Sequence, residues 1–145
     1  MFPDRKKDLV KLQFGEYVSL GKVESELKAC PLVDNICVYA DPTKDNCVAI
    51  VSPVQQNLEE LASSLGKTDL RLEKLCLDDD ISKAVLKMLI NVGKKARLEK
   101  FEFPSRVHLT SERWTPESDL VTAAFKLKRK IIQNRYQEDI NRMYS

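Results

Sequence analysis

Two short segments of the chain hold side chains whose types and spacing could do chemistry. Residues 122–136 contain no acidic residue and five basic ones, which are Lys126, Lys128, Arg129, Lys130 and Arg135. Clustered positive charge of this kind attracts phosphate groups. The same pattern is typical of a solvated helix face, and charge alone favours that structural interpretation over a binding site. The other segment reads DRKKD at residues 4–8 and is followed by Lys11 and Gly15-Glu16.

The remaining reactive side chains give little support for metal or disulfide chemistry. The four cysteines form no CxxC pair and His108 is the only histidine, so the sequence predicts no zinc site. Apolar neighbours favour reduced, buried thiols at all four positions, which are Cys30, Cys37, Cys47 and Cys76. The acidic run from Asp78 to Asp80 suits a helix start better than a metal site. We interpret His108 as a structural or surface residue.

Length, composition and charge exclude several classes of protein. The 145 residues are close to the common size of one domain, and 43% of them are hydrophobic, which is enough to build a core. The 24 Lys and Arg residues nearly balance the 22 Asp and Glu residues, and this argues against a general nucleic-acid-binding protein. No apolar run approaches the roughly 18 residues of a membrane span, and the N-terminus has no signal-peptide core. Any membrane anchor of the native protein is therefore expected outside this chain.

The elements that must position the two segments begin with a hairpin and a helix. Short apolar pieces flank Gly15, which can adopt the positive φ of a tight turn, so a β-hairpin is expected here. Apolar residues then recur at helical spacing from Leu20 to Cys30, and Pro31 ends that helix. The basic pair Lys6-Lys7 precedes the hairpin directly.

The rest of the chain predicts an α+β fold. Residues 35–40 and 47–51 are rich in β-branched residues and flank the turn-forming segment DPTKDN, which predicts two antiparallel strands. Residues 106–109 alternate as a third strand, so the central sheet is expected to be mostly antiparallel. Helices are predicted over residues 58–65 with Gly66 at the end, over 70–77, over 81–92 with Asp80 as the cap, and over 128–144.

The two chemically suggestive segments also carry a resemblance to a known family. DRKKDLVKLQFGEYVSLGKVESEL resembles the hinge-and-hairpin motif that opens the C-terminal domain of adenylate-forming enzymes, specifically the long-chain fatty acyl-CoA synthetases. LVTAAFKLKRKIIQNRY resembles the C-terminal lysine motif of the same family, and WTPES before it fits the long-chain branch. The resemblance covers residues 4–145. One departure from the wider superfamily is Phe125, which stands where a glycine usually precedes the motif lysine.

The resemblance implies roles for individual residues. Lys126 aligns with the catalytic lysine of adenylation, and its neighbours Lys128, Arg129 and Lys130 are expected to support it or to face solvent. Arg5 and Lys11 are expected to contact ATP or AMP, and Lys7 aligns with the hinge of the domain. After adenylation the domain is expected to rotate, so that Gly15, Glu16 and Tyr17 line the CoA tunnel or the domain interface.

The resemblance also implies what lies outside the chain. Residues 1–145 are expected to be a single C-terminal lid domain, with residues 1–11 forming the linker and first hairpin strand. The large N-terminal domain would hold the phosphate loop and acyl pocket, so the chain alone is expected to be inactive. The implied substrates are Mg-ATP, a fatty acid and CoA. The implied location is a cytosol-facing membrane surface, on the endoplasmic reticulum, mitochondrial outer membrane, peroxisome or lipid droplet.

Two other classes of function stay open at this point. A non-catalytic interaction module could keep the same fold, and a basic nucleic-acid-binding domain could explain the charge cluster. The presence of Lys126 within its motif favours the ligase domain over the interaction module. The balanced charge disfavours nucleic-acid binding.

Overall fold

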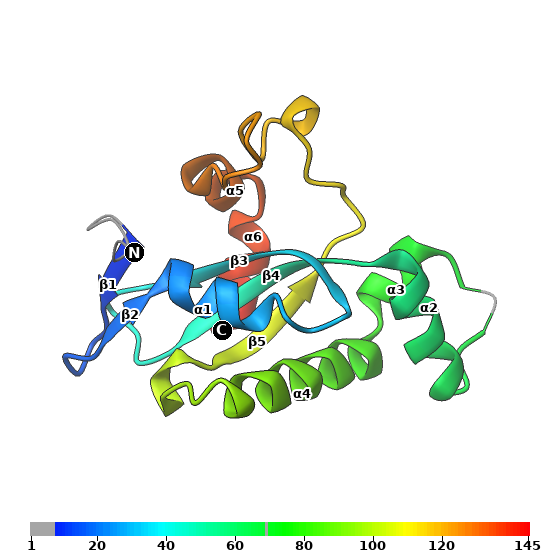
Figure 1. Ribbon diagram of the computed structural model, residues 1–145, viewed down its shortest axis with the longest axis horizontal. Helices are drawn as coiled ribbons and strands as arrows, with labels where there is room; N and C mark the ends of the chain where they lie inside the picture. Colours follow the sequence, from blue (N-terminus) through cyan, green and yellow to red (C-terminus); the bar gives the residue numbers. More distant parts are fainter. Residues whose placement is uncertain (1–7, 69) are drawn as a thin grey trace.

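The central sheet has three strands in the order β3-β4-β5, and a separate two-stranded hairpin precedes it (Figure 1). The computed structural model describes residues 8–68 and 70–145. The hairpin consists of β1 (Leu9–Lys11) and β2 (Tyr17–Ser19), which pair antiparallel as predicted. Gly15 in its turn has a φ of +97°, a value that favours glycine.

Strand β4 lies in the middle of the central sheet and is buried along its whole length. It spans Cys47–Pro53 and pairs antiparallel with β3 (Val33–Ala40), which confirms the predicted hairpin. Its other neighbour, β5 (Pro104–Leu109), runs parallel to it, so the sheet is mixed. The chain between β4 and β5 contains the helices of a crossover connection, and a crossover returns the chain to the end where β4 began. The α+β prediction is confirmed, with one antiparallel and one parallel ladder.

One α-helix precedes β3 and three lie between β4 and β5. They are α1 (Leu20–Leu27), α2 (Gln55–Ser64), α3 (Leu72–Leu77) and α4 (Asp79–Lys95). The predicted cap of α4 is wrong by two residues, because the carboxylate of Asp78 accepts the amides of Asp80 and Ile81 at 2.9 and 3.1 Å. The helix begins one residue before Asp80, so the amides that need a cap lie next to Asp78.

Two hydrophobic cores lie on opposite faces of the sheet because side chains alternate along β4. Ala49 and Val51 point into the larger core, which helices α1 to α4 cover. Val48 and Ile50 point into a smaller core on the other face. That second face is covered by the C-terminal helices α5 (Arg129–Arg135) and α6 (Gln137–Tyr144), which lie behind and above the sheet in Figure 1.

The second core fixes the C-terminal third of the chain. Short 3-10 turns at Lys100–Glu102 and Pro116–Ser118 flank β5, and the predicted terminal helix is divided at Tyr136 into α5 and α6. Trp114, Leu120 and Ile132 are buried in this core, and they hold residues 110–128 over the sheet. All four cysteines are free and buried, as predicted.

Candidate functional site

Lys126 lies at the tip of a tight hairpin that only the folded chain reveals. Val121 and Leu127 form an isolated antiparallel bridge, and the amide of Thr122 donates to the carbonyl of Lys126 at 2.8 Å. The amide of Phe125 donates back to the carbonyl of Thr122 at 2.7 Å, and Phe125 has a φ of +60°. This combination is a turn closed by a residue in the left-handed region, as in three-residue hairpin loops. The loop is the orange hairpin at the top of Figure 1.

The base of this hairpin is buried and its tip is exposed. Leu120 and Val121 are buried in the second core, and the amide of Lys128 donates to the carbonyl of Leu120 at 2.9 Å. Residues 123–126 are all exposed. In residues 8–68 and 70–145, no ion pair engages the Lys126 ammonium. The ammonium is therefore a positive charge held out from a fixed base.

A half-buried guanidinium anchors the start of α5, which directly follows the Lys126 hairpin. Arg129 donates from Nη1 and Nη2 to the two carboxylate oxygens of Glu24 at 2.6 and 2.7 Å. Its Nε donates to the Asp8 carboxylate at 3.0 Å, and the Glu24 carboxylate also accepts the amide of Val38 at 2.8 Å. We call Arg129, Glu24 and Asp8 the arginine anchor. It ties the hairpin to α1, to β3 and to the segment that directly follows residue 7.

The electrostatics of the arginine anchor follow from its burial. Loss of solvent raises the pKa of Glu24, and the hydrogen bonds and positive charge of Arg129 oppose that rise. Burial alone would lower the pKa of Arg129, but its bonds to Glu24 outweigh this and raise it. A bidentate, charge-assisted pair of this kind fixes orientation as well as supplying energy. Sequence reasoning placed Arg129 only as a supporting or solvent-facing residue, and the structure shows that it supports the hairpin.

The neighbours of Arg129 differ from it. Lys128 forms an ion pair with Asp119 on the surface, and Lys130 is exposed. Asp119 is another non-glycine residue in the left-handed region, with a φ of +65°. These two lysines lie outside the buried anchor.

A polar network around Tyr136 holds the segment that precedes the Lys126 hairpin. The Tyr136 hydroxyl accepts from the indole nitrogen of Trp114 at 3.2 Å and donates to the carboxylate of Glu112 at 2.6 Å. It also lies 3.1 Å from the hydroxyl of Thr110. Burial raises the pKa of Tyr136 to about 12, so the phenol stays neutral and keeps its proton for Glu112. These bonds join the segment before the hairpin to Tyr136, which directly follows α5, so the hairpin is braced from both sides.

His108 has a structural environment rather than a catalytic one. Its Nε2 lies 3.4 Å from the Asp139 carboxylate, and its ring lies 5.9 Å from the ring of Tyr136. Burial lowers the pKa of His108, while the negative charge of Asp139 opposes that shift. No cysteine or serine of the described chain is hydrogen-bonded to it. The structural interpretation of His108 is therefore supported.

The other predicted site residues lie on the β1–β2 hairpin, well away from Lys126. Gly15 forms the turn, and a Cβ added there would meet nothing within 4 Å. Tyr17 is 59% exposed, and the Lys11 ammonium lies 5.9 Å from its ring centroid. Glu16 accepts the amide of Leu12 through its carbonyl at 2.7 Å. In Figure 1 this hairpin lies at the left, whereas the Lys126 hairpin lies at the top, so the chain does not bring the two groups together.

Two predicted residues lie outside the described part of the chain. These are Arg5, predicted to contact ATP or AMP, and Lys7, predicted as the hinge. The described chain begins at Asp8, which belongs to the arginine anchor. The anchor therefore includes the residue that follows the predicted hinge in the sequence.

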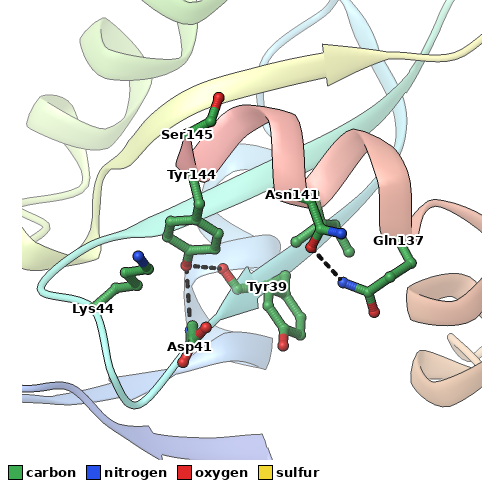
Figure 2. Close-up of a pocket in the computed structure, with 8 residues that line it drawn as sticks. Tyr39, Asp41, Lys44, Gln137, Asn141, Tyr144 and Ser145 are labelled. Carbon is green, nitrogen blue, oxygen red and sulfur yellow. Dashed lines mark hydrogen bonds between the residues drawn. The ribbon is translucent and has the colours of Figure 1, made fainter.

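A shallow hollow of about 290 Å³ lies between α6 and the β3–β4 loop (Figure 2). The Tyr144 hydroxyl accepts the amide of Asp41 at 3.2 Å and donates to the carbonyl of Asn46 at 2.9 Å. The Lys44 ammonium lies 5.9 Å from the Tyr144 ring centroid. These groups are engaged with one another, so the hollow is explained by the packing of the C-terminus.

The described residues contain neither a candidate metal site nor a candidate membrane span. Within residues 8–68 and 70–145, no three His, Cys, Asp or Glu side chains are grouped closely enough to hold a metal ion. In the same part of the chain, no helix is both long enough and apolar enough to cross a bilayer.

Comparisons with known proteins agree over nearly the whole chain. It is 49% identical over 142 residues to "Long chain acyl-CoA synthetase 8" of Arabidopsis thaliana, covering 98% of this chain and 20% of the relative. It is 37% identical over 142 residues to "Fatty acyl-CoA synthetase B" of Dictyostelium discoideum, covering 98% and 21%. The chain thus spans about a fifth of the length of the curated relatives it matches. No family model matches the chain.

Solved structures show the same fold. The adenylation domain of a carboxylate reductase from Mycobacterium chelonae matches with a TM-score of 0.83 and 30% identity, covering 98% of this chain and 20% of that one. An adenylation and carrier-protein didomain of a carboxylic acid reductase from Segniliparus rugosus, solved with AMP, matches with a TM-score of 0.82 and 25% identity, covering 100% and 18%. In sequence this chain is homologous to the C-terminal part of the long-chain acyl-CoA synthetases, and it has the fold of that domain in adenylate-forming enzymes.

Proposed function

We propose that this chain is the C-terminal lid domain of a long-chain fatty acyl-CoA synthetase, and that Lys126 is its catalytic residue for adenylation. In that reaction the fatty acid carboxylate attacks the α-phosphorus of ATP, pyrophosphate leaves, and an acyl-adenylate forms. The thiol sulfur of CoA then attacks the acyl carbonyl, AMP leaves with the bonding electrons, and the thiol proton goes to a base or to water. The alternative is a non-catalytic interaction module with the same fold.

The placement of Lys126 is the observation that carries this proposal. Its ammonium has no carboxylate partner in the described chain, it lies at an exposed hairpin tip, and its base is braced by the arginine anchor. A lysine that merely solubilises a surface needs no such bracing. An ammonium presented from a rigid base can be placed between two anions, and this lowers the barrier where their negative charges accumulate.

The charge of Lys126 suits the first half-reaction. A carboxylate and a triphosphate repel each other, so a cation must lie between them as they approach. An ammonium is a compact point charge on a long flexible stem, and it can reach both oxygens from a hairpin tip. The neighbouring Arg129 cannot share this task because its donors are engaged with Glu24, Asp8 and the sulfur of Cys37.

The β1–β2 hairpin is proposed to act in the second half-reaction. Because it lies at another edge of the domain, it can face the active site only if the domain turns between steps. Gly15 is exposed and has open space where a Cβ would point, which suits a CoA arm passing close to the backbone. Glu16 and Tyr17 are proposed to line that tunnel or the domain interface.

The remaining roles complete the proposal. Lys7 is proposed as the hinge, and Arg5 and Lys11 as contacts to ATP or AMP; the Lys11 side chain is exposed, and its ammonium lies over the Tyr17 ring. The partner is a large N-terminal domain of the same enzyme, because the chain spans only about a fifth of its relatives. Mg-ATP, CoA and a fatty acid are the proposed ligands. The full-length enzyme is proposed to face the cytosol from a membrane surface.

The test is to assay each half-reaction with and without the large domain. A full-length synthetase whose C-terminal domain is this chain should exchange ATP with pyrophosphate and should form acyl-CoA. The 145-residue chain alone should do neither, although circular dichroism should show it folded. Turnover by the isolated chain, or a folded full-length protein without adenylation, would contradict the proposal.

A further inference from the structure

Two turns in this molecule have the same hydrogen-bonding pattern but different residues at the position with positive φ, which are Gly15 and Phe125. In the β1–β2 hairpin the amide of Gly15 donates to the carbonyl of Leu12 at 3.0 Å, and the amide of Leu12 donates to the carbonyl of Glu16. In the Lys126 hairpin Phe125 and Thr122 take the places of Gly15 and Leu12. Both turns put their fourth residue in the left-handed region, at φ +97° and +60°.

A phenylalanine in the left-handed region is conformationally unfavourable. The Cβ of an L-residue crowds the following carbonyl there, and glycine avoids this crowding. Backbone strain of this kind persists only where other interactions offset its free-energy cost, and it occurs most often at functional sites. The first turn of this chain has a glycine at this position. Among the described residues, Arg97 and Asp119 are also non-glycine residues with positive φ, but Phe125 is the aromatic one.

Packing within this chain does little to offset the conformational cost at Phe125. Phe125 is 62% exposed and belongs to neither hydrophobic core. Phe125 lines an open hollow of about 350 Å³, and the other lining residues are Lys28, Asp34, Asn35, Arg113, Trp114 and Thr115. A large aromatic ring that is strained and mostly in water gains little from the domain that carries it.

We propose that Phe125 is a docking residue, and that its ring enters an apolar recess of the large N-terminal domain when Lys126 is in place for adenylation. This inference rests on the proposed function. Consecutive Cα atoms are about 3.8 Å apart, so the ring must accompany Lys126 into the closed site. Ala123 and Ala124 are small and exposed beside it, and they leave room for another surface to approach the turn.

The chemistry of the site favours a protein recess over the fatty acyl tail as the occupant. Lys126 is proposed to act where the carboxylate meets the phosphate, at the polar end of the substrate. A ring one residue away from that ammonium is near the polar end as well, whereas the apolar tail extends away from it. The binding energy of the ring would then hold Lys126 in position during adenylation and be released when the domain turns.

The strain itself can be measured on the isolated 145-residue chain, which has two hydrophobic cores of its own. Phe125→Gly and Phe125→Ala both remove the ring, but only glycine fits the left-handed turn. Urea unfolding should therefore give Phe125→Gly an unfolding equilibrium constant roughly fivefold smaller than that of Phe125→Ala. Equal stability of the two variants would remove the premise of the proposal.

The docking role is tested in the full-length synthetase. Phe125→Gly should lower kcat/KM for acyl-adenylate formation roughly tenfold, and it should spare CoA attack on supplied acyl-adenylate. Phe125→Trp should recover most of the lost activity because it restores an aromatic ring. Leu77→Ala is the matched control, since Leu77 is also an exposed apolar residue (76%) but lies on α3, and it should change neither half-reaction.

Three results would overturn the docking role. These are unchanged adenylation by Phe125→Gly, equal loss in both half-reactions, and a loss that grows with the length of the fatty acid. The last result would assign the ring to the acyl tail. Lys126→Ala separates the two proposals: if it adenylates normally, the proposed function fails, and if it is inactive while Phe125→Gly is normal, only the docking role fails.

Discussion

The two hairpins of this domain close with the same turn but are supported in different ways. The β1–β2 hairpin has three residue pairs of its own, and its turn is tied to the β3–β4 loop by the amide of Gln13, which donates to the carbonyl of Lys44 at 2.8 Å. The Lys126 hairpin has a single bridge between Val121 and Leu127. Its support comes from the arginine anchor behind it.

The difference is consistent with the roles proposed for the two hairpins. A hairpin that presents its backbone to the CoA arm, as proposed for β1–β2, needs only its ladder and a glycine. A hairpin that presents one ammonium for adenylation, as proposed for Lys126, needs a well-supported base, because an error of about 1 Å in position costs much of the rate. Side-chain charge and burial supply that base where the backbone ladder is too short.

The largest expected effect is the loss of Lys126. In the full-length synthetase Lys126→Ala should slow acyl-adenylate formation roughly a hundred- to thousandfold, or ~3–4 kcal/mol, because one charge that faces the developing anion is removed. Lys126→Arg should not restore the rate, since a planar guanidinium does not fit an ammonium site. CoA attack on supplied acyl-adenylate should be nearly unchanged. Lys130→Ala is the control, and a larger loss there would mean that the catalytic role was given to the wrong lysine.

The arginine anchor should dominate the stability of the domain. Glu24→Gln leaves the half-buried Arg129 with only Asp8 as an ionic partner, and we expect a loss of about 3 kcal/mol in the free energy of unfolding. Urea denaturation of the isolated chain measures it. Glu26→Gln is the matched control because Glu26 lies exposed on the same helix. If the two variants are equally stable, then the anchor does not brace the Lys126 hairpin.

The turn of the first hairpin should show a smaller effect. Gly15→Ala should cost about 1 kcal/mol of stability, because alanine disfavours a φ of +97° while its Cβ meets no neighbour. Gly15→Asn should cost less, since asparagine tolerates this region. If the rate of thioester formation falls by more than the loss of folded protein explains, this would support passage of CoA beside Gly15. An unchanged rate in a folded full-length enzyme would count against it.

The surface ion pair beside the Lys126 hairpin should matter least. Lys128 and Asp119 are both considerably exposed, so Asp119→Asn should change the free energy of unfolding by less than about 0.5 kcal/mol. Chemical denaturation in low and high salt is the measurement. A loss comparable to that of Glu24→Gln would show that the hairpin depends on surface charge as well as on the buried anchor.

Much of the fold was predictable from short-range patterns. The turn at Gly15, the strands around the DPTKDN loop and the amphipathic helix after Asp80 all appear in the structure, because each depends on residues near one another in the chain. The cap of α4 was misplaced because three consecutive aspartates can all cap a helix, and only the position of the first turn selects Asp78.

The sequence by itself determined the kinds of element and the two motifs that identify the domain. Only the tertiary structure decided that β5 runs parallel to β4, that Arg129 pairs with Glu24 across 105 positions of chain, and that Phe125 occupies a left-handed turn. Helix and strand patterns arise from contacts a few residues apart. Ion pairs, sheet order and the support of a hairpin depend on contacts between residues that are far apart in the sequence. Local residue patterns do not specify which of these distant surfaces pack together.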